Sequence, residues 1–196
     1  MSRLPLVASD QANATQAALL QAVQSKLGRV PNLLRGLANS SAALRGYLDL
    51  SAALGADAML TAHEREVIAL AVAEANGCEY CLAAHTAIGK STGMDAHAIT
   101  AARRASGGEP TADAVAKLAA AVVATRGRVS DDDLNQFRAA GFDDAAVAEV
   151  VAAVALNTLT NYFNNLAQTE VDFPVAAPLE EVGEAAACTT ACGCSV

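Results

Sequence analysis

Two cysteines and a histidine lie close together near the middle of the chain, at Cys78, Cys81 and His85. The preceding Asn76-Gly77 is a strong helix stop, and no helix breaker follows it for about ten residues, so a new helix is expected to begin at Cys78. On that helix the three side chains share one face. Cysteines three positions apart at a helix start can reach the Cα separation of roughly 4.4–6.8 Å that a disulfide requires. The spacing therefore predicts a redox dithiol.

The surroundings of this pair favour a reactive thiolate. A helix N-terminus carries partial positive charge and free N–H groups, which lower the pKa of a cysteine. His85 lies one turn after Cys81 and could accept its proton, and Glu66 could fold back from the preceding helix to orient the imidazole. Carboxylate, imidazole and thiol together activate a nucleophilic cysteine. We therefore expect Cys81 to be the more acidic thiol of the two.

The spacing of these residues resembles the active-site motif of the alkyl hydroperoxidase D family. Cys78 follows Glu66 by twelve positions, and Cys81 and His85 follow in turn. Segments 30–33, 161–164 and 169–174 are similar to the peroxidase-related branch of the wider carboxymuconolactone decarboxylase-like superfamily, so the resemblance spans roughly residues 28–174. In the alkyl hydroperoxidase D motif a histidine stands between the cysteines, where this chain has Tyr80.

The resemblance implies a thiol-dependent peroxidase without a metal or other cofactor. Cys81 would attack the hydroperoxide, and Cys78 would resolve the resulting sulfenic acid into a disulfide. Glu66 and His85 would form the proton relay, and Tyr80 would shape the pocket, donate a hydrogen bond or serve only in packing. A second dithiol, lipoyl-type or thioredoxin-like, would reduce the disulfide. The family also implies a homo-oligomer, a trimer or a hexamer.

Two other functions remain open at this point. A carboxymuconolactone decarboxylase-like lactone enzyme does not require cysteines, so the intact dithiol argues against it. A metal- or partner-binding protein could use Cys78, Cys81 and His85 as ligands, although zinc would need a fourth ligand. A thioredoxin-type site is not indicated, because no strand is predicted before the motif and the chain has no tryptophan.

The elements that must position these residues are all predicted to be helices. Thr61 and Glu64 form a capping box for the helix that carries Glu66. Glycines punctuate the remainder of the chain into helical segments, and no segment alternates apolar and polar residues as a strand does. Hydrophobic residues make up 53% of the sequence but aromatic residues only 4%, which favours close-packed helices. We therefore predict an all-α fold, a compact array of antiparallel helices.

A final long helix is predicted from Asp143-Asp144 to about residue 166, and it carries a polar stripe. Asn157, Asn161 and Asn164 lie on one face of this otherwise apolar helix. Buried asparagines need hydrogen-bond partners. The stripe is either a pocket wall opposite the thiols or a hydrogen-bonded helix or subunit interface, and we prefer the interface.

The composition changes after Pro174, so we expect a helical domain over residues 1–174 and a flexible tail over 175–196. The tail carries three of the five cysteines, Cys188, Cys192 and Cys194. Thiols on a flexible segment could exchange with the 78–81 disulfide, bind a soft metal, or have no part in the chemistry. Of the two functional alternatives, we favour thiol exchange.

Charge and apolar patterning limit the partners. The formal net charge of −8 argues against nucleic acid and against anionic membrane surfaces, which both attract basic patches. No segment is predicted to target the chain or to cross a bilayer. We therefore expect a cytoplasmic, reducing location, where a close cysteine pair is more often catalytic or metal-binding than structural.

Overall fold

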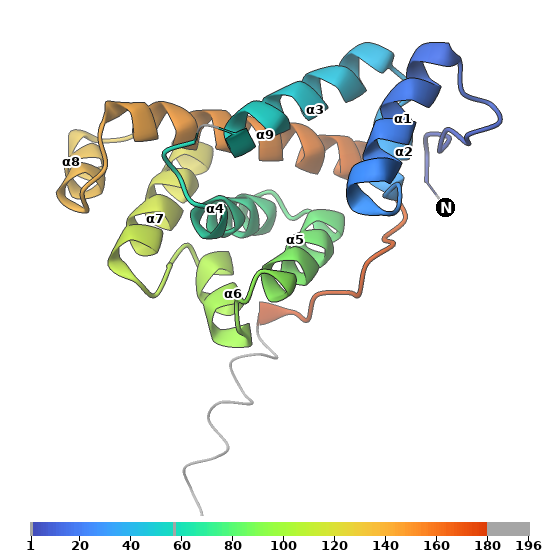
Figure 1. Ribbon diagram of the computed structural model, residues 1–196. Helices are drawn as coiled ribbons and strands as arrows, with labels where there is room; N and C mark the ends of the chain where they lie inside the picture. The colour runs from blue at the N-terminus through green and yellow to red at the C-terminus, as the bar shows by residue number, and fades with distance from the viewer. Residues whose placement is uncertain (1, 57, 180–196) are drawn as a thin grey trace, which may run out of the picture.

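Helices make up the core of the computed structural model, which describes residues 2–56 and 58–179 (Figure 1). The helices of this part of the chain are α1 (Ala14–Leu27), α2 (Asn32–Leu37), α3 (Ser41–Ala56), α4 (Ala62–Ala75), α5 (Glu79–Ser91), α6 (Ala96–Arg103), α7 (Pro110–Thr125), α8 (Asp131–Ala139) and α9 (Asp144–Ala167). No strand occurs among the described residues, and the predicted all-α fold is confirmed. The tail cysteines Cys188, Cys192 and Cys194 lie outside the described residues.

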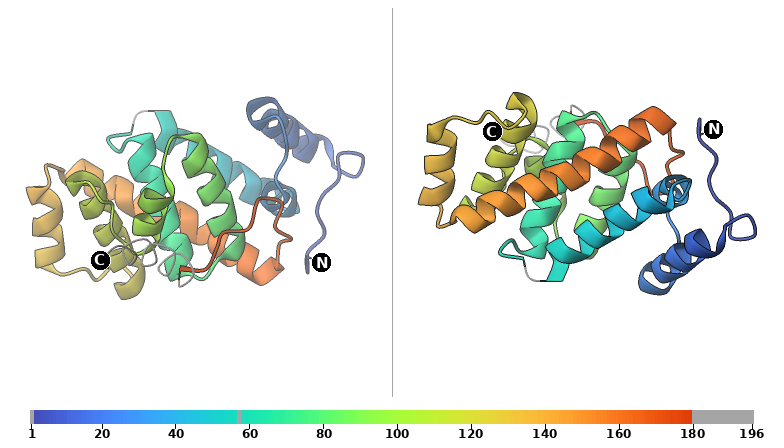
Figure 2. Two further views of the ribbon diagram at one scale, coloured as in Figure 1. Left: turned by 90° about the horizontal axis from the view of Figure 1, so that it is seen from below. Right: turned by 90° about the horizontal axis from the view of Figure 1, so that it is seen from above.

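Helix α4 lies at the centre of the array. It contacts α5, α6, α7 and α9, and the residues from Val67 to Ala73 are all buried. Helix α9 is the longest helix and runs from α8 at one end of the array toward α2 at the other, with α3 beside part of its length (Figure 2). The helix that carries Glu66 is therefore held on several sides, and α5, which carries the cysteines, packs against both α4 and α9.

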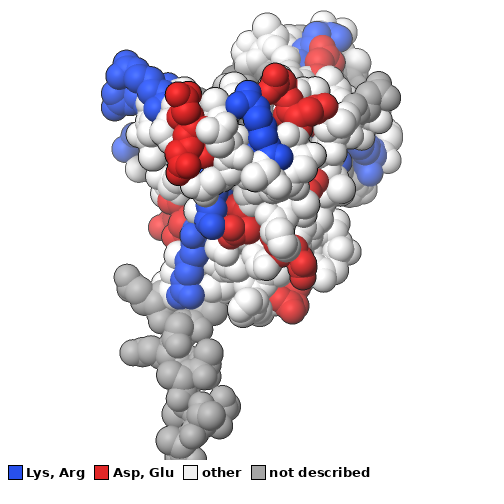
Figure 3. Space-filling model, turned by 90° about the vertical axis from the view of Figure 1, so that its left-hand side faces the viewer, with Lys and Arg blue, Asp and Glu red and all other residues white. Residues whose placement is uncertain are grey.

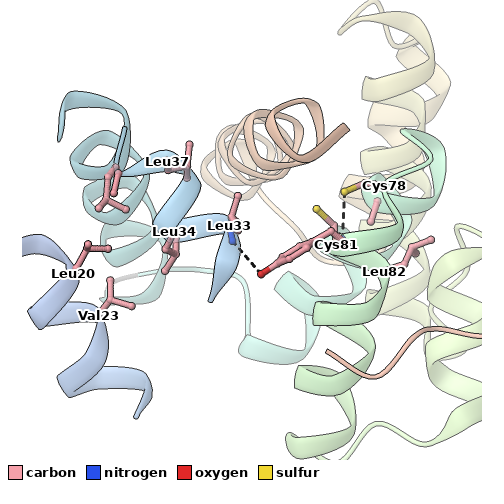
Figure 4. Close-up of a cluster of buried hydrophobic side chains, with 12 residues drawn as sticks. Leu20, Val23, Leu33, Leu34, Leu37, Cys78, Cys81 and Leu82 are labelled. Carbon is pink, nitrogen blue, oxygen red and sulfur yellow. Dashed lines mark hydrogen bonds between the residues drawn. The ribbon is translucent and has the colours of Figure 1, made fainter. Parts of the chain in front are cut away.

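The thiols lie inside a hydrophobic cluster. Cys78 and Cys81 pack with buried residues of α1, α2 and α3, among them Leu20, Leu34 and Leu44 (Figure 4). A second cluster fills the space between α4, α7, α8 and α9. The dithiol therefore sits in the wall of a packed core, where burial strengthens each hydrogen bond and charge around it.

The chain after α9 folds back over the helices. It runs past α5 toward α6 in Figure 1. Ala176 packs against the cluster that contains the thiols, and Arg103 donates a hydrogen bond of 2.7 Å to the carbonyl of Ala177. The chain thus continues to contact the helices for several residues after Pro174.

Two features matter for possible nucleic-acid and membrane partners: the distribution of surface charge and the apolar character of the longest helix, α9. On the face drawn in Figure 3, acidic and basic side chains are interspersed. Helix α9 is the one helix of the described residues that is long and apolar enough to cross a membrane, with a mean hydropathy of 1.3 over its best window. Its buried residues pack against α3, α4, α5 and α7, as those of a central core helix do.

Candidate redox site

The turn between α4 and α5 positions the first cysteine. Gly77 has a φ of +58°, in the left-handed region that favours glycine. Its N–H donates to the carbonyl of Glu74 at 3.0 Å, and the N–H of Cys78 donates to the carbonyl of Ala73 at 2.9 Å. These two bonds form a Schellman motif, which ends α4. Cys78 becomes the N-cap of α5, and its Sγ accepts a hydrogen bond of 3.3 Å from the N–H of Cys81.

Both thiols are buried, but only Cys81 borders the cavity that holds the predicted relay. This cavity has a volume of about 240 Å³, and Glu66 and His85 also line it. Figure 4 shows both sulfurs on the side of α5 that faces α9. We name this space the relay cavity. Cys81 lines the relay cavity, whereas the fully covered Cys78 does not.

The predicted carboxylate–imidazole pair is formed. The Oε2 atom of Glu66 lies 2.8 Å from Nδ1 of His85, and both side chains are only about one-fifth exposed, at 17% and 21%. Burial lowers the pKa of His85, but the charges of Glu66 and Cys81 more than offset it, so the pKa of the imidazole is raised. His85 is therefore expected to carry a proton beside a thiolate.

The two thiols differ sharply in acidity. Hydrogen bonding by Cys78 is the largest cause that lowers the pKa of Cys81 to about 6, and the charge of His85 lowers it further against the effect of burial. The same thiol pairing, together with burial and the Cys81 charge, raises the pKa of Cys78. Near neutral pH the pair is therefore a Cys81 thiolate beside a Cys78 thiol. This agrees with the expected order of acidity, but the main cause is the partner thiol rather than His85.

The asparagine stripe of α9 faces the dithiol and the relay cavity. Nδ2 of Asn164 donates to Sγ of Cys81 at 3.3 Å, and hydrogen bonding by Asn161 also lowers the pKa of that thiol. Asn157 lines the relay cavity and donates to the carbonyl of Ala153 at 2.9 Å. The stripe is thus a hydrogen-bonded helix interface, as preferred, and Asn157 and Asn164 also form a wall beside the relay cavity and the thiols. Because α9 packs directly on α5, its polar side chains meet the sulfur atoms.

Tyr80 differs from the other predicted site residues. Its ring lines the relay cavity, but its hydroxyl donates to Oδ1 of Asp172 at 2.7 Å and accepts from the N–H of Leu33 at 3.2 Å. Burial raises the pKa of the phenol, and its ring meets that of Phe173 edge to face with centroids 5.7 Å apart. The structure thus brings Glu66, Cys81 and His85 together, while the Tyr80 hydroxyl connects α5 to α2 and to the segment after α9.

A second tyrosine lines the relay cavity and was not singled out from the sequence. Tyr47 of α3 is near enough to Cys81 and Glu66 that their charges, together with burial, raise its pKa. Ser51, one turn later, lines the same cavity. The only sequence signal is that these two hydroxyls share a face of a helix rich in alanine and leucine. Tyr47 therefore offers a protonated hydroxyl to an oxygen atom in the cavity.

The thiols and the imidazole could also have been metal ligands. Among the described residues, no group of three or more His, Cys, Asp or Glu side chains is placed to hold a metal ion.

The sequence and the fold were each compared with those of known proteins. Residues 41–126 match the sequence model of the carboxymuconolactone decarboxylase family. None of the curated proteins compared with the chain matches it. The crystal structure of an alkylhydroperoxidase AhpD core, an uncharacterized peroxidase-related protein from Ralstonia eutropha JMP134, superimposes with a TM-score of 0.79 at 27% identity, covering 87% of this chain and 92% of that one.

Two further crystal structures share the fold at lower identity. An uncharacterized peroxidase-related protein from Silicibacter sp. TM1040 has a TM-score of 0.75 at 23% identity, covering 90% of this chain and 92% of that one. The debrominase Bmp8, in complex with 2,3,4-tribromopyrrole, has a TM-score of 0.73 at 18% identity, covering 93% and 96%. The matched family segment includes Glu66, Cys78, Cys81 and His85, and the fold agreement extends over most of the chain. The chain is therefore similar to the alkyl hydroperoxidase D-like/carboxymuconolactone decarboxylase superfamily, in sequence over residues 41–126 and in fold over most of its length.

Proposed function

We propose that this protein is a thiol-dependent peroxidase that uses the Cys78/Cys81 dithiol. One observation carries the proposal. The acidic thiol of Cys81 borders a cavity together with the Glu66–His85 pair, while a protonated Cys78 lies beside it in the core. A nucleophile, a proton donor and a resolving thiol are thereby available in one place.

The chemistry follows from these protonation states. The Cys81 thiolate attacks the terminal oxygen of a hydroperoxide, the O–O bond breaks, and the departing alkoxide takes the proton that His85 holds. This leaves Cys81 as a sulfenic acid and releases an alcohol. The sulfur of Cys78 then attacks the Cys81 sulfur, and its proton leaves with the hydroxyl group as water. The product is the 78–81 disulfide, and the only oxidant consumed is the hydroperoxide.

Turnover needs a second dithiol that returns two electrons to the disulfide. A lipoyl-type or thioredoxin-like partner would supply them, and a reducing compartment such as the cytoplasm would keep that partner reduced. No metal or organic cofactor takes part in this scheme. We further propose that the protein acts as a homo-oligomer, a trimer or a hexamer.

The test is single-turnover oxidation of the reduced protein. The full chain with Cys188, Cys192 and Cys194 changed to Ser removes competing thiols, and wild type is measured beside it. Stopped-flow mixing with one equivalent of hydrogen peroxide, cumene hydroperoxide or tert-butyl hydroperoxide should consume both thiols, with a 78–81 disulfide found by peptide mass spectrometry. In Cys78→Ser, Cys81 should stop at the sulfenic acid and over-oxidise. If both thiols of the folded protein stay titratable, the peroxidase function is wrong.

The same protein separates the alternatives. Lactone chemistry would survive Cys81→Ser, because it does not need the thiols. A metal-binding function would appear as stoichiometric metal in the purified protein, lost in the Cys78→Ser and Cys81→Ser variants. A thiolate in a small cavity could also attack a halogenated ring, so 2,3,4-tribromopyrrole belongs in the substrate panel. Consumption of that compound without consumption of any hydroperoxide would contradict the proposal.

A further inference from the structure

A second cavity lies next to the dithiol and shares only Tyr80 with the relay cavity among their lining residues. It has a volume of about 360 Å³ and is enclosed by the start of α5, the end of α9 and the segment that follows α9. We name it the amide cavity, because amide side chains form much of its wall. The residues that matter here are Gly77, Glu79, Asn164, Asn165, Gln168 and Thr169.

Two buried polar atoms of this wall have no hydrogen-bond partner among the described residues. They are Oδ1 of Asn164 and Oγ1 of Thr169, and their side chains belong to residues that are 3% and 7% exposed. Leaving a buried polar group unpaired costs about 1–3 kcal/mol. Both atoms are covered in this conformation, so an occupant of the cavity would reach them only after the side chains of Asn164 and Thr169 turn toward it.

Asn164 both lines the amide cavity and contacts the dithiol. Its Nδ2 donates to Sγ of Cys81, and its hydrogen bonding lowers the pKa of Cys78 as well. Cys78 is fully covered in the reduced protein, but both of its chain neighbours, Gly77 and Glu79, line the amide cavity. A movement of one amide side chain, that of Asn164, would therefore uncover the dithiol from this side.

The chemistry of disulfide reduction requires a route to Cys78. A thiolate that attacks a disulfide expels the other sulfur, and the more acidic thiol leaves faster. When Cys81 leaves as a thiolate, the charge of His85 and the hydrogen bond from Asn164 still stabilise it, so attack on the sulfur of Cys78 is favoured. Cys78 lines neither cavity in the reduced protein, but its chain neighbours Gly77 and Glu79 line the amide cavity and not the relay cavity.

We propose that the amide cavity is the access site of the reductant, whose thiolate attacks the sulfur of Cys78 past Asn164, while the oxidant reaches Cys81 through the relay cavity. This inference rests on the proposed redox function of the dithiol. In the first step the bond between the incoming sulfur and Cys78 forms, the 78–81 bond breaks, and the electron pair stays on Cys81 as a thiolate. A second thiol of the reductant then attacks the mixed disulfide and releases Cys78, which takes up a proton. The reductant leaves as a disulfide.

The wall of the amide cavity also indicates which thiols it admits. Glu79 is the one charged residue among the described residues that line it, and it is negative. Amide and hydroxyl groups supply the remaining polar wall. The cavity therefore favours an uncharged thiol with hydrogen-bonding groups over an anionic thiol of similar size.

The first experiment identifies the sulfur that is attacked. The full chain with the tail cysteines changed to Ser is oxidised with diamide, so that no peroxide chemistry is involved. It is then mixed briefly with 2-mercaptoethanol, quenched with N-ethylmaleimide and mapped by peptide mass spectrometry. Mercaptoethanol should be found on Cys78 and maleimide on Cys81. The reverse pattern, in a protein that did form the 78–81 disulfide, overturns the inference but leaves the proposed function standing.

The second experiment tests the cavity itself with a charge reversal. Glu79→Lys should raise the rate of reduction by the anionic 2-mercaptoethanesulfonate relative to uncharged 2-mercaptoethanol. A change of two elementary charges several ångströms from the attacking thiol is worth on the order of 3- to 10-fold at low ionic strength, and less in salt. The matched control is Asp131→Lys, because Asp131 is likewise an acidic residue at the first position of a helix. It lies on α8, far from α5 (Figure 1).

The outcomes are distinct. A ratio that rises only in Glu79→Lys supports the amide cavity as the access site. A ratio that is equal in wild type and both variants overturns it, even if Cys78 is the sulfur attacked. A folded protein in which diamide forms no 78–81 disulfide overturns both the inference and the proposed function.

Discussion

At the scale of single residues, the reactivity of Cys81 depends first on the other cysteine. Hydrogen bonding by Cys78 is the largest cause of the lowered pKa of Cys81, ahead of the charge of His85. The hydrogen bond with Cys78 stabilises the Cys81 thiolate, and it exists only while both thiols are reduced. The resolving cysteine thus also activates the nucleophile, and the two roles can be separated by titration.

We expect Cys78→Ala to raise the pKa of Cys81. In the protein with a tail free of cysteines, alkylation of Cys81 by iodoacetamide should be half-maximal near pH 6, because the thiolate is present above its lowered pKa and lost below it. In Cys78→Ala the midpoint should move to higher pH. The alkylation rate near pH 6 should then fall, by roughly fivefold if the pKa of Cys81 rises by about 1. His85→Ala should move the midpoint in the same direction, because a positive neighbour is lost.

The rate–pH profile of each variant provides the measurement, and Cys81→Ser identifies the alkylated residue. Equal midpoints in wild type and Cys78→Ala would show that the thiol pairing does not control the acidity of Cys81. A higher midpoint in Cys78→Ala without one in His85→Ala would remove only the imidazole from this role.

At the scale of elements, local sequence signals predicted the helices well but not the partners of their faces. The Thr61–Glu64 capping box and the stop at Asn76-Gly77 are formed by neighbours in the chain, so the starts of α4 and α5 could be predicted. The helical spacing also placed Cys78 and Cys81 correctly at the start of α5. These features need no knowledge of tertiary packing.

The contacts that could not be predicted join distant segments. Periodicity shows that Asn161 and Asn164 share a face of α9, but it does not show that this face meets α5. Tyr80 bonds to Asp172, 92 positions later, and no local pattern pairs a tyrosine with that carboxylate. Tyr47 reaches the relay cavity only because α3 packs beside α9. The site is therefore predictable where it lies within one helix–turn–helix unit and not where other helices complete it.

We expect Tyr80→Phe to weaken the fold rather than the thiol chemistry. The change removes the donor to Asp172 and the acceptor of the Leu33 N–H, a partly buried and a buried hydrogen bond that join three segments. The free energy of unfolding should fall by about 1–3 kcal/mol in a urea titration. The matched control is Tyr162→Phe, because Tyr162 is 60% exposed and should tolerate the loss of its hydroxyl.

The pH midpoint of Cys81 alkylation should stay unchanged in Tyr80→Phe. A variant of normal stability with a changed midpoint would show instead that the phenol acts on the thiols. The variant Tyr80→His tests whether an imidazole at this position can take part in the thiol chemistry. The imidazole should raise peroxidase activity only if it turns toward the sulfur atoms and away from Asp172.

At the scale of the whole molecule, helix α9 has two different faces: a buried face that carries polar side chains and an exposed face that is apolar. Its exposed face joins α7 in a groove of about 760 Å³, and neither Cys78 nor Cys81 lines that groove. Leu159, Tyr162 and Leu166 line it and are 44%, 60% and 62% exposed. Contiguous apolar patches on a protein surface commonly mark interaction sites. We therefore place the contact between copies of the proposed homo-oligomer on this groove.

Leu159→Glu combined with Leu166→Glu should lower the molar mass measured by size-exclusion chromatography with light scattering, because two carboxylates would be buried without partners in the interface. Both side chains are already well exposed in one protomer, so circular dichroism and thermal unfolding should stay near wild type. Val175→Glu is the control, since Val175 is 84% exposed and lies outside the groove. A wild-type protein that is monomeric at micromolar concentration, or a double variant of unchanged mass, would contradict this placement.

The alkylation midpoint of Cys81 should be the same in the dissociated variant, because Glu66, His85, Cys78 and Asn164 all reach that thiol from within one chain.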